Sequence, residues 1–486
     1  MSHEVSAVVA AAAALMAQGQ ADRALDVLET EIQRIDQPQL RGYAGEAALR
    51  AGQPLRARGH LDIATRLDPD NIDLRINLAL ALIELGEPSR AVDLLQDHAT
   101  VNPSRALLLN LGRALQDNHR WADAARVLNQ ILAADPADTE ALTNLGTVWR
   151  DAGHDLQAVD CFERALVLNP SLKAARDNLS HVTLAMGDYH RGFTHFEGRQ
   201  FKDATGLSAQ MARWDGRPMR GLTVHVIAEQ GFGDMLMFAR FGAVLAERGI
   251  DAVLHVHPRL VRLLRRSPGF KEVVAYGRAA VGTLARWIPL MSLPHVLGVT
   301  LDALPGIVPY LHADRARAER FTHWLGPRAG LRVGIAWAGN PQSEKDDLRG
   351  RSIPLEHFGS LLNINGLQLI SLQRQNGLDQ VDGVIFSGQL RRPEPELDLG
   401  ADGFLDTAAL ISVLDLVVTC DTSVAHLAGG LGQPVWVALH HTADWRWMRQ
   451  RADSPWYPTM RLFRQTVPGD WGGVFATIAQ QLARTP

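Results

Sequence analysis

The sequence predicts a multidomain fold class, in which an all-α solenoid of helical hairpins precedes an α/β domain made of two Rossmann-like halves. Three observations support it. A period of about 34 residues organises the first part of the chain, short β-rich runs alternate with helical patterns after it, and 486 residues are too many for one core. The predicted domains are residues 1–200, 201–325 and 326–486.

The period is defined by residues that recur at nearly constant spacing. Four prolines are 34, 33 and 34 residues apart, and an alanine stands twelve residues before each. Five residues before each alanine comes a glycine or, once, His119. The glycine permits a turn, the alanine lets helices cross closely, and the proline ends the second helix. The residues are Gly52, Gly86 and Gly153; Ala57, Ala91, Ala124 and Ala158; and Pro69, Pro103, Pro136 and Pro170.

This pattern resembles the tetratricopeptide repeat, most clearly in ALTNLGTVWRDAGHDLQAVDCFERALVLNP at residues 141–170. The same frame extends upstream to Gly19 and downstream to Gly187, which gives about six repeats. Such repeats bury their apolar faces between neighbours and present a concave groove. The resemblance therefore implies a protein-binding module over residues 1–200.

An asparagine recurs in the first helix of four successive repeats. A side-chain amide carries both a donor and an acceptor, so a row of asparagines can pair with an extended peptide backbone of any sequence. Equally, the asparagine can be part of the repeat consensus. The nucleocytoplasmic O-linked N-acetylglucosamine transferases hold acceptor polypeptide with a comparable ladder, and that resemblance implies acceptor-peptide binding by Asn77, Asn110, Asn144 and Asn178.

Beyond residue 200, seven apolar runs predict β-strands, and helical patterns separate most of them. Parallel strands need crossover connections, so this alternation predicts parallel sheets covered on both faces, with the two halves meeting near residues 326–328. The final pattern, VFATIAQQLA at 474–483, predicts a helix that returns to the first half. The predicted strands are 224–229, 252–257, 272–276, 333–339, 367–373, 416–420 and 435–439.

The run at 416–420 leads through Asp421, Thr422 and Ser423 into a helical pattern of small residues. Ligands of parallel sheets bind at the carboxyl ends of the strands, where helix N-termini offer N–H groups and a positive dipole end. The expected ligand is a phosphate, held by the N–H groups that follow Asp421.

The counterpart in the first half follows the run at 224–229. Gly231 and Gly233 permit a tight turn and a close ligand approach, and Asp234 opens the next helix. A third glycine of the dinucleotide fingerprint is missing, and the sequence has no Gly-Lys-Ser/Thr phosphate loop. Asp234 is either an N-cap or a base that faces the cleft.

Three segments together resemble the heptosyltransferase-like glycosyltransferases of family 9, which have a GT-B fold: GFGDML (231–236), WAGNP (337–341) and DTSVAHLAGGLGQPVW (421–436). The resemblance covers roughly residues 205–486. In combination with the repeats, the chain is similar to bacterial protein glycosyltransferases, including those that modify flagellin with nonulosonic acids. Ser423 stands where family 9 often has glycine, so ADP-heptose is not implied as the donor.

By this resemblance, Asp234 is the catalytic aspartate. His426 either contacts the donor or supports its ligands through a hydrogen bond, and Arg351 lies where the family keeps a basic residue near the donor phosphates. Trp445 and Arg446 are candidates for stacking on or pairing with the nucleotide, while Trp447 and Trp456 suit packing between the halves. The expected donor or nucleotide ligands are Gly231, Gly233, Asn340, Arg351, Asp421, Thr422, Ser423, His426, Trp445 and Arg446.

Composition narrows the function further. A net charge of -4 gives no electrostatic footprint for nucleic acid, and no apolar run approaches the length of a membrane span. Two cysteines, Cys161 and Cys420, suit a reducing compartment, so the expected location is the cytoplasm. The one Asp-x-Asp sequence, Asp68 to Asp70, lies at a repeat end, and no Cys/His spacing suits zinc, so no metal is expected.

The expected activity is transfer of a sugar from a nucleotide-activated donor to a Ser or Thr hydroxyl of a protein, without a metal or another cofactor. The expected partners are this nucleotide sugar, as a substrate, and a protein acceptor in the repeat groove, with flagellin implied by the resemblance. Two alternatives remain: an inactive scaffold or chaperone with a degenerate transferase domain, and a transferase that acts on lipopolysaccharide or another glycan.

Overall fold

The computed structural model describes residues 3–218, 221–277, 284–346, 350–393, 398 and 403–484. These residues form two compact units: a helical unit, Met1–Leu179, and a sheet unit, Ser180–Pro486. The predicted fold class is confirmed, because helical hairpins make up the first unit and two parallel sheets make up the second.

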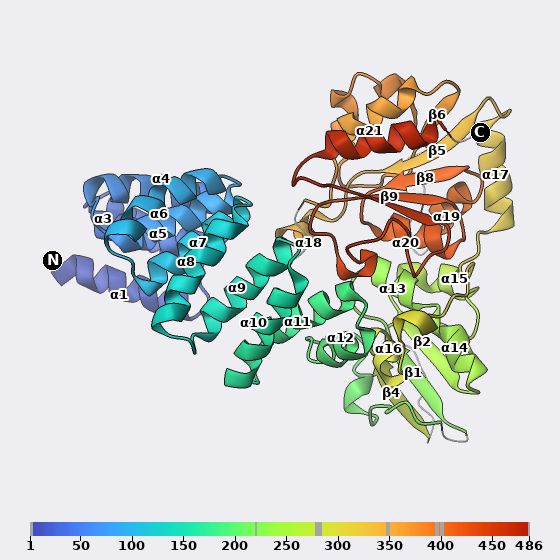
Figure 1. Cartoon of the computed structure of the whole chain (residues 1–486), viewed down its shortest axis with the longest axis horizontal. Helices are drawn as coiled ribbons and strands as arrows, with labels where there is room; N and C mark the ends of the chain where they lie inside the picture. The colour runs from blue at the N-terminus through green and yellow to red at the C-terminus, as the bar shows by residue number, and fades with distance from the viewer. Residues whose placement is uncertain are drawn as a thin grey trace. The chain divides into compact units, whose positions relative to one another are not determined.

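Successive helices of the helical unit pack against one another (Figure 1), so that the apolar face of each hairpin is buried by its neighbours. The last helix, α11, runs past the end of this unit into the next. The helices are α1 (His3–Ala17), α2 (Ala21–Ile32), α3 (Pro38–Arg50), α4 (Pro54–Leu67), α5 (Ile72–Glu84), α6 (Pro88–Val101), α7 (Arg105–Asp117), α8 (Trp121–Ala134), α9 (Thr139–Asp151), α10 (Asp155–Leu168) and α11 (Lys173–Met186).

The residues of the period have the roles that the sequence predicts. The four repeat alanines are fully buried, and each repeat proline follows the end of a second helix by two residues. The three repeat glycines adopt positive φ angles between helices, and His119 does so at 57°. The histidine therefore replaces glycine in the same left-handed turn, at some conformational cost.

The sheet unit contains one sheet of four parallel strands, in the order β3-β2-β1-β4, and one of six, in the order β10-β9-β8-β5-β6-β7. All seven predicted strands are present. The strands are β1 (Thr223–Ile227), β2 (Asp251–Val256), β3 (Glu272–Ala275), β4 (Ala285–Pro289), β5 (Leu331–Ala336), β6 (Leu367–Ser371), β7 (Leu390–Arg391), β8 (Leu416–Thr419), β9 (Val435–Leu439) and β10 (Met460–Arg464).

The strands that the sequence pattern missed are β4, β7 and β10, and all three lie at sheet edges. An edge strand has one side without a neighbouring strand, so it tolerates polar residues such as Arg286 in β4 and Arg461 in β10. These strands therefore lack the continuous apolar run that marks a central parallel strand.

Helices cover both sheets, and α13 packs against α20 between them (Figure 1). The expected return of the last helix to the first half is wrong: α21 packs on β10 and on the 3₁₀ segment Leu355–Asn363 of the second half. The helices are α12 (Tyr189–Phe196), α13 (Phe232–Phe238), α14 (Phe241–Glu247), α15 (Val261–Leu264), α16 (Leu293–Val296), α17 (Arg315–Leu325), α18 (Pro341–Asp346), α19 (Leu405–Ile411), α20 (Ser423–Gly430) and α21 (Trp471–Leu482).

Helix α12 belongs to the sheet unit, although the predicted repeat array extends to residue 200. Its Tyr189 and Phe193 are 1% exposed and pack against Trp445 and Trp456 of the second half. Helix α12 thus shares an aromatic core with the second half of the sheet unit, while the predicted repeat boundary at residue 200 remains a prediction. The predicted boundary between the two sheet halves, near residue 325, remains a prediction.

Two helical glycines give opposite predictions for stability. A methyl group on Gly146 would lie 2.6–2.9 Å from ring atoms of the fully buried Phe162, whereas a methyl group on Gly59 would meet no atom within 4 Å. We expect Gly146→Ala to lower the free energy of unfolding by about 1–3 kcal/mol through overpacking. Gly59→Ala, the matched control, should raise it by about 0.5–1 kcal/mol through helix propensity.

Urea unfolding of the full chain, followed by far-ultraviolet circular dichroism, measures both changes. Equal effects of the two substitutions would contradict the close packing of α9 on α10.

Candidate active site

A cavity of about 900 Å³ lies within the sheet unit and is lined by residues of both halves. Its walls include the segments that follow β1, β2, β5, β6 and β8, because the carboxyl ends of parallel strands gather at one edge of each sheet. This volume suits a ligand of nucleotide size. Except for the four repeat asparagines, every predicted site residue lines this cavity.

Asp234 lies at the third position of α13, where its carboxylate accepts a hydrogen bond from the Gly231 N–H at 3.0 Å. The N-cap is Gly231, so Asp234 is not the N-cap. Its other carboxylate oxygen pairs with Arg446, and the side chain is 17% exposed at the cavity wall. Burial raises the pKa of Asp234, and the attraction of Arg446 opposes that rise.

The N-terminus of α20 reaches the cavity through Asp421, Thr422 and Ser423. Thr422 is the N-cap, and its Oγ1 accepts a hydrogen bond from the Val424 N–H at 3.3 Å. The helix end is thus partly capped by its own side chain. A ligand here would meet Ser423 and the positive end of the helix dipole, rather than a fully open row of N–H groups.

Arg351 lies against Gly339, where a Cβ atom would come within 2.6 Å of its Nε. Its Nη2 donates to the Asn340 carbonyl at 3.4 Å, and its Nε is 3.5 Å from a Glu344 carboxylate oxygen. Arg351 and Asn340 therefore form one wall of the cavity after β5. Arg349, two residues before Arg351, lies outside the described residues.

Two further arginines of the cavity, Arg259 and Arg374, are absent from the predicted site. Each has a buried guanidinium nitrogen without a hydrogen-bond partner among the described residues, as does Arg351. A buried, unsatisfied cationic donor favours an anionic ligand. Both residues directly follow predicted strands, which end at 257 and 373. Ligands of parallel sheets bind at this end of the strands, so this position could have identified the two arginines from the sequence.

Arg446 pairs with two carboxylates, although its Nε, like a nitrogen of each of those three arginines, lacks a hydrogen-bond partner among the described residues. It pairs with Asp234 and, through Nη1 at 2.8 Å, with Asp444, which the sequence analysis also missed. Burial opposes ionisation of Asp444, but Arg446 holds the pKa of Asp444 below its usual value. Burial together with the neighbouring Asp444 charge raises the pKa of Asp421 to about 6. The surroundings of Asp421 therefore disfavour the ionised form of its carboxyl group.

His426 lies on α20 with its ring stacked on Trp447, at a centroid distance of 5.2 Å. Its Nδ1 is 3.0 Å from the Tyr457 hydroxyl, and its opposite edge lies against Gly233 of α13. Burial, reinforced by Arg446, lowers the pKa of His426 to about 3, so the ring is a neutral imidazole at physiological pH.

Trp445 is only 3% exposed, and its ring packs against Phe193 and Trp456. The Arg446 guanidinium lies 4.5 Å above that ring. Arg446 therefore occupies the space above one face of Trp445, and stacking of this ring on a nucleotide base remains a prediction. Trp447 and Trp456 are buried in the core, and Trp456 packs against Phe238 of the first half.

The four repeat asparagines are half-buried on α5, α7, α9 and α11. The side-chain amides of Asn110 and Asn178 donate to carbonyls four residues earlier, at 2.8 and 2.9 Å, and Arg150 donates to the Asn178 side chain. Part of their hydrogen-bonding capacity is therefore used within the helical unit. Peptide binding by Asn77, Asn110, Asn144 and Asn178 remains a prediction.

In the part of the chain that the structure describes, no three His, Cys, Asp or Glu side chains are grouped closely enough to hold a metal ion. Over the same residues, no helix combines the length and hydrophobicity that crossing a lipid bilayer requires.

Two family models described as tetratricopeptide repeat match the chain, over residues 48–111 and 109–173. The helical unit is thus a tetratricopeptide solenoid. These matches lie entirely within it and say nothing of the sheet unit.

The chain is 27% identical over 476 residues to "Protein FlbA" of Caulobacter vibrioides, a match that covers 91% of this chain and 78% of that protein. It is also 30% identical over 141 residues to "Protein O-mannosyl-transferase TMTC3" of Homo sapiens, which covers 28% of this chain and 15% of that protein.

Among solved structures, the Escherichia coli ADP-heptose lps heptosyltransferase II matches with a TM-score of 0.37 and 14% identity, over 54% of this chain and 96% of that one. A thermophilic tetratricopeptide protein of Thermus thermophilus matches with a TM-score of 0.33 and 20% identity, over 37% of this chain and 98% of that one.

The raised pKa of Asp421 predicts a pH-dependent cost to stability. Between its ordinary value of 3.8 and about 6, the folded chain holds a proton that the unfolded chain releases. Stability from this group therefore falls as pH rises through that window, and the cost is complete above it. We expect Asp421→Asn to stabilise the chain by on the order of 1–2 kcal/mol at pH 7.5.

Thermal unfolding at pH 7.5 and at pH 4 measures this effect, with the exposed Asp93→Asn as the matched control. The melting temperature of Asp421→Asn should exceed that of the native chain only at the higher pH. An equal rise at both pH values would show that the carboxylate charge is not the cause.

Proposed function

We propose that the chain is a glycosyltransferase that moves a sugar from a nucleotide-activated donor to a Ser or Thr hydroxyl of a protein. One observation carries the proposal: the Asp234 carboxylate, from the first half, lines the same cavity as the incompletely paired Arg351 and Arg374 and the α20 N-terminus of the second half. A base and an anion site facing one volume are what sugar transfer from a phosphate leaving group requires.

The donor phosphates would lie between Arg351, Arg374 and Ser423. Two guanidinium groups and a helix N-terminus can neutralise the negative charge that develops on the departing phosphate oxygen. The buried nitrogens of Arg351 and Arg374 would gain the hydrogen-bond partners that the described residues do not provide. This arrangement needs no metal ion to balance the leaving group.

Asp234 would act as the general base. The acceptor hydroxyl gives its proton to the carboxylate as its oxygen attacks the anomeric carbon of the sugar. A new carbon–oxygen bond forms, the bond from the anomeric carbon to the phosphate oxygen breaks, and its electron pair leaves with the nucleotide. The attraction of Arg446 opposes the rise that burial causes in the pKa of Asp234 and so favours the ionised form that a base requires.

A protein acceptor is supported by the helical unit, because tetratricopeptide repeats are typical of protein binding. The resemblance drawn from the sequence points to flagellin as the acceptor and a nonulosonic acid as the sugar. We place the reaction in the cytoplasm, where the two buried cysteines stay reduced.

A second candidate function is a catalytically inactive scaffold. It is favoured by the pairing of Asp234, whose carboxylate already accepts from the Gly231 N–H and from Arg446. In that case Asp234 would serve only to cap α13 and to join the two halves. A transferase that acts on lipopolysaccharide or another glycan is a third outcome of the test below.

Asp234→Asn should reduce sugar transfer about 10²–10⁴-fold, because an amide cannot take the proton while it can still accept from Gly231. The chain is incubated with candidate nucleotide sugars and host-cell extract, and intact-protein mass spectrometry follows the sugar mass on polypeptides. The exposed Asp160→Asn, on α10, is the control and should leave transfer unchanged. Sugar transfer to glycans alone would overturn the proposed protein acceptor. Equal transfer by Asp234→Asn and the native chain would overturn the proposed base.

Arg351→Gln should weaken nucleotide binding about 10–100-fold, because it removes a charged donor from the phosphate site. A thermal-shift series with nucleoside mono- and diphosphates measures this loss, since a ligand of the folded state raises the melting temperature. Arg315→Gln, whose side chain is 94% exposed on α17, is the matched control. Retained binding by Arg351→Gln would place the phosphates elsewhere in the cavity.

A further inference from the structure

Arg240, between α13 and α14, is a buried cation without a carboxylate partner among the described residues. It is fully buried, and its guanidinium donates to the carbonyls of Met237 at 2.9 Å and Trp456 at 2.7 Å. The rings of Tyr310 and Tyr457 flank it at 4.8 and 4.7 Å. Carbonyl dipoles and aromatic faces thus balance this charge in place of an anion.

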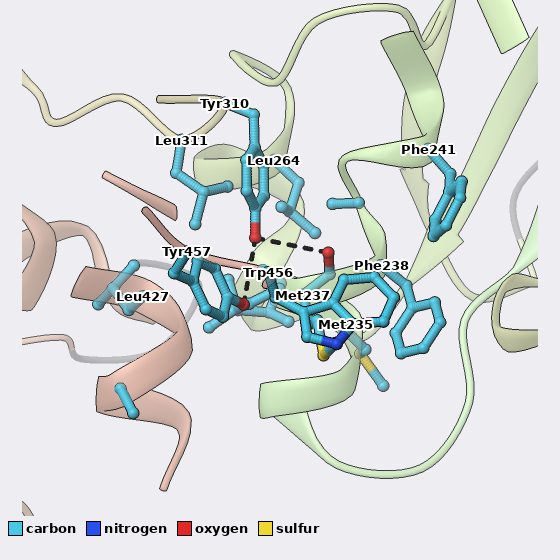
Figure 2. Packing of buried hydrophobic residues seen from close by; sticks show 14 of the residues in the cluster. Met235, Met237, Phe238, Phe241, Leu264, Tyr310, Leu311, Leu427, Trp456 and Tyr457 are labelled. Atoms are coloured by element: carbon cyan, nitrogen blue, oxygen red, sulfur yellow. Dashed lines mark hydrogen bonds between the residues drawn. The ribbon is translucent and has the colours of Figure 1, made fainter. Parts of the chain in front are cut away.

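Two tyrosine hydroxyls connect Arg240 to the cavity. Arg240 donates to the Tyr310 hydroxyl at 3.2 Å, and that oxygen is 3.4 Å from the Met237 carbonyl and 3.5 Å from the Tyr457 hydroxyl (Figure 2). The Tyr457 hydroxyl in turn is 3.0 Å from Nδ1 of His426. The chain of contacts therefore runs from a buried charge to a histidine of the cavity wall.

The positions of the protons follow from the acceptors within reach. The Met237 carbonyl can only accept, so the Tyr310 proton is best directed there, while the Tyr310 oxygen accepts from Arg240. The Tyr457 proton then has the shorter contact to His426, at 3.0 Å, and the longer one to Tyr310, at 3.5 Å. Distance favours donation to His426.

Electrostatics favours the same direction. The positive charge of Arg240 next to the Tyr457 ring makes the phenol a stronger donor. It also disfavours an Nδ1–H of His426 that would point its positive end toward the guanidinium. The arrangement with Nδ1 as the acceptor is therefore the more stable one, and the single ring proton of the neutral His426 is on Nε2.

The Nε2 edge of His426 faces the turn that carries Asp234. A Cβ atom on Gly233 would lie 2.9 Å from Cδ2 and 3.5 Å from Nε2 of this ring, so the absence of a side chain there lets the imidazole reach the cavity wall. The stack on Trp447 fixes the plane of the ring. An Nε2–H at this wall can donate to an oxygen of a bound ligand.

We propose that Tyr457, polarised by the buried Arg240, is a positioning residue that holds His426 as the Nε2–H tautomer, so that His426 donates a hydrogen bond to the anionic leaving group. The role at the leaving group rests on the proposed function; the tautomer does not. A phosphate oxygen accepts but cannot donate, so the opposite tautomer would face it with a lone pair and weaken binding.

The first test measures the tautomer in the full chain labelled with ¹⁵N-histidine. Two-bond nitrogen–proton correlation spectra distinguish a protonated from an unprotonated ring nitrogen, and His426→Gln identifies the signals of His426 by their loss. We expect an unprotonated Nδ1 in the native chain and a disturbed pattern in Tyr457→Phe, which keeps the ring over Arg240. Tyr310→Phe, the matched control, also removes a hydroxyl near Arg240 and should leave the pattern intact.

The second test is a double-mutant cycle with inorganic pyrophosphate as the probe, followed by isothermal titration calorimetry. Tyr457→Phe should weaken pyrophosphate binding about tenfold in the native background. A glutamine at position 426 keeps an N–H donor near the Nε2 position without a tautomer to be fixed, so Tyr457→Phe should change binding less than about twofold in the His426→Gln background.

A protonated Nδ1 in the native chain, or a pattern unchanged in Tyr457→Phe, would overturn the proposal whatever the chain catalyses. Equal losses in both backgrounds would overturn the link to the leaving group. If pyrophosphate fails to bind the native chain, the proposed donor site fails with it, while the spectra still decide the tautomer.

Discussion

The sheet unit depends on the guanidinium of Arg240, whose charge and N–H groups are stabilised by carbonyls and aromatic rings instead of a carboxylate. Arg240 is fully buried, and its partners come from segments far apart in the chain: the Met237 carbonyl, the Trp456 carbonyl and the rings of Tyr310 and Tyr457. A buried cation that lost these partners would be strongly destabilising. Its contacts with Trp456 and Tyr457 therefore join the first half to the second, where α13 also packs on α20.

The same packing decides the shape of the cavity. The facing helices bring the turn at Gly233 against His426 and place Asp234 within reach of Arg446. Arg351 and Arg374 line the same cavity, and a ligand there can supply their missing hydrogen-bond partners. The cavity thus contains several guanidinium groups with unsatisfied nitrogens, among them Arg351 and Arg374, and these can bind an anion.

Much of the fold could be predicted because its signals are local and periodic. The repeat alanines, glycines and prolines specify helix crossings and turns directly, and central parallel strands such as β8 and β9 are continuous apolar runs. Edge strands such as β4 escaped because their exposed positions accept polar residues. The return of the last helix was predicted wrongly, since the amphipathic pattern of α21 does not reveal which half it covers.

Prediction of the candidate site from the sequence was limited in the same way. Asp234, Asp421 and their neighbours could be found because they follow strands and begin helices. Arg259 and Arg374 occupy similar positions, yet isolated arginines carry no motif, and only their burial next to the cavity distinguishes them. The capping of α20 by Thr422 and the pairing of Asp234 with Arg446 depend on side-chain geometry that spacing in the sequence does not encode.

Helix α12 also determines where this chain can be divided. A gene fragment starting at codon 201 would encode the sheets without Tyr189 and Phe193, and the aromatic faces of Trp445 and Trp456 would be left open to water. A fragment starting ahead of α11, before Lys173, would retain that cover together with both helices of the pair α11 and α12. Over evolution, earlier repeats of the array can be duplicated or lost, whereas the last helical pair has to be inherited together with the sheets.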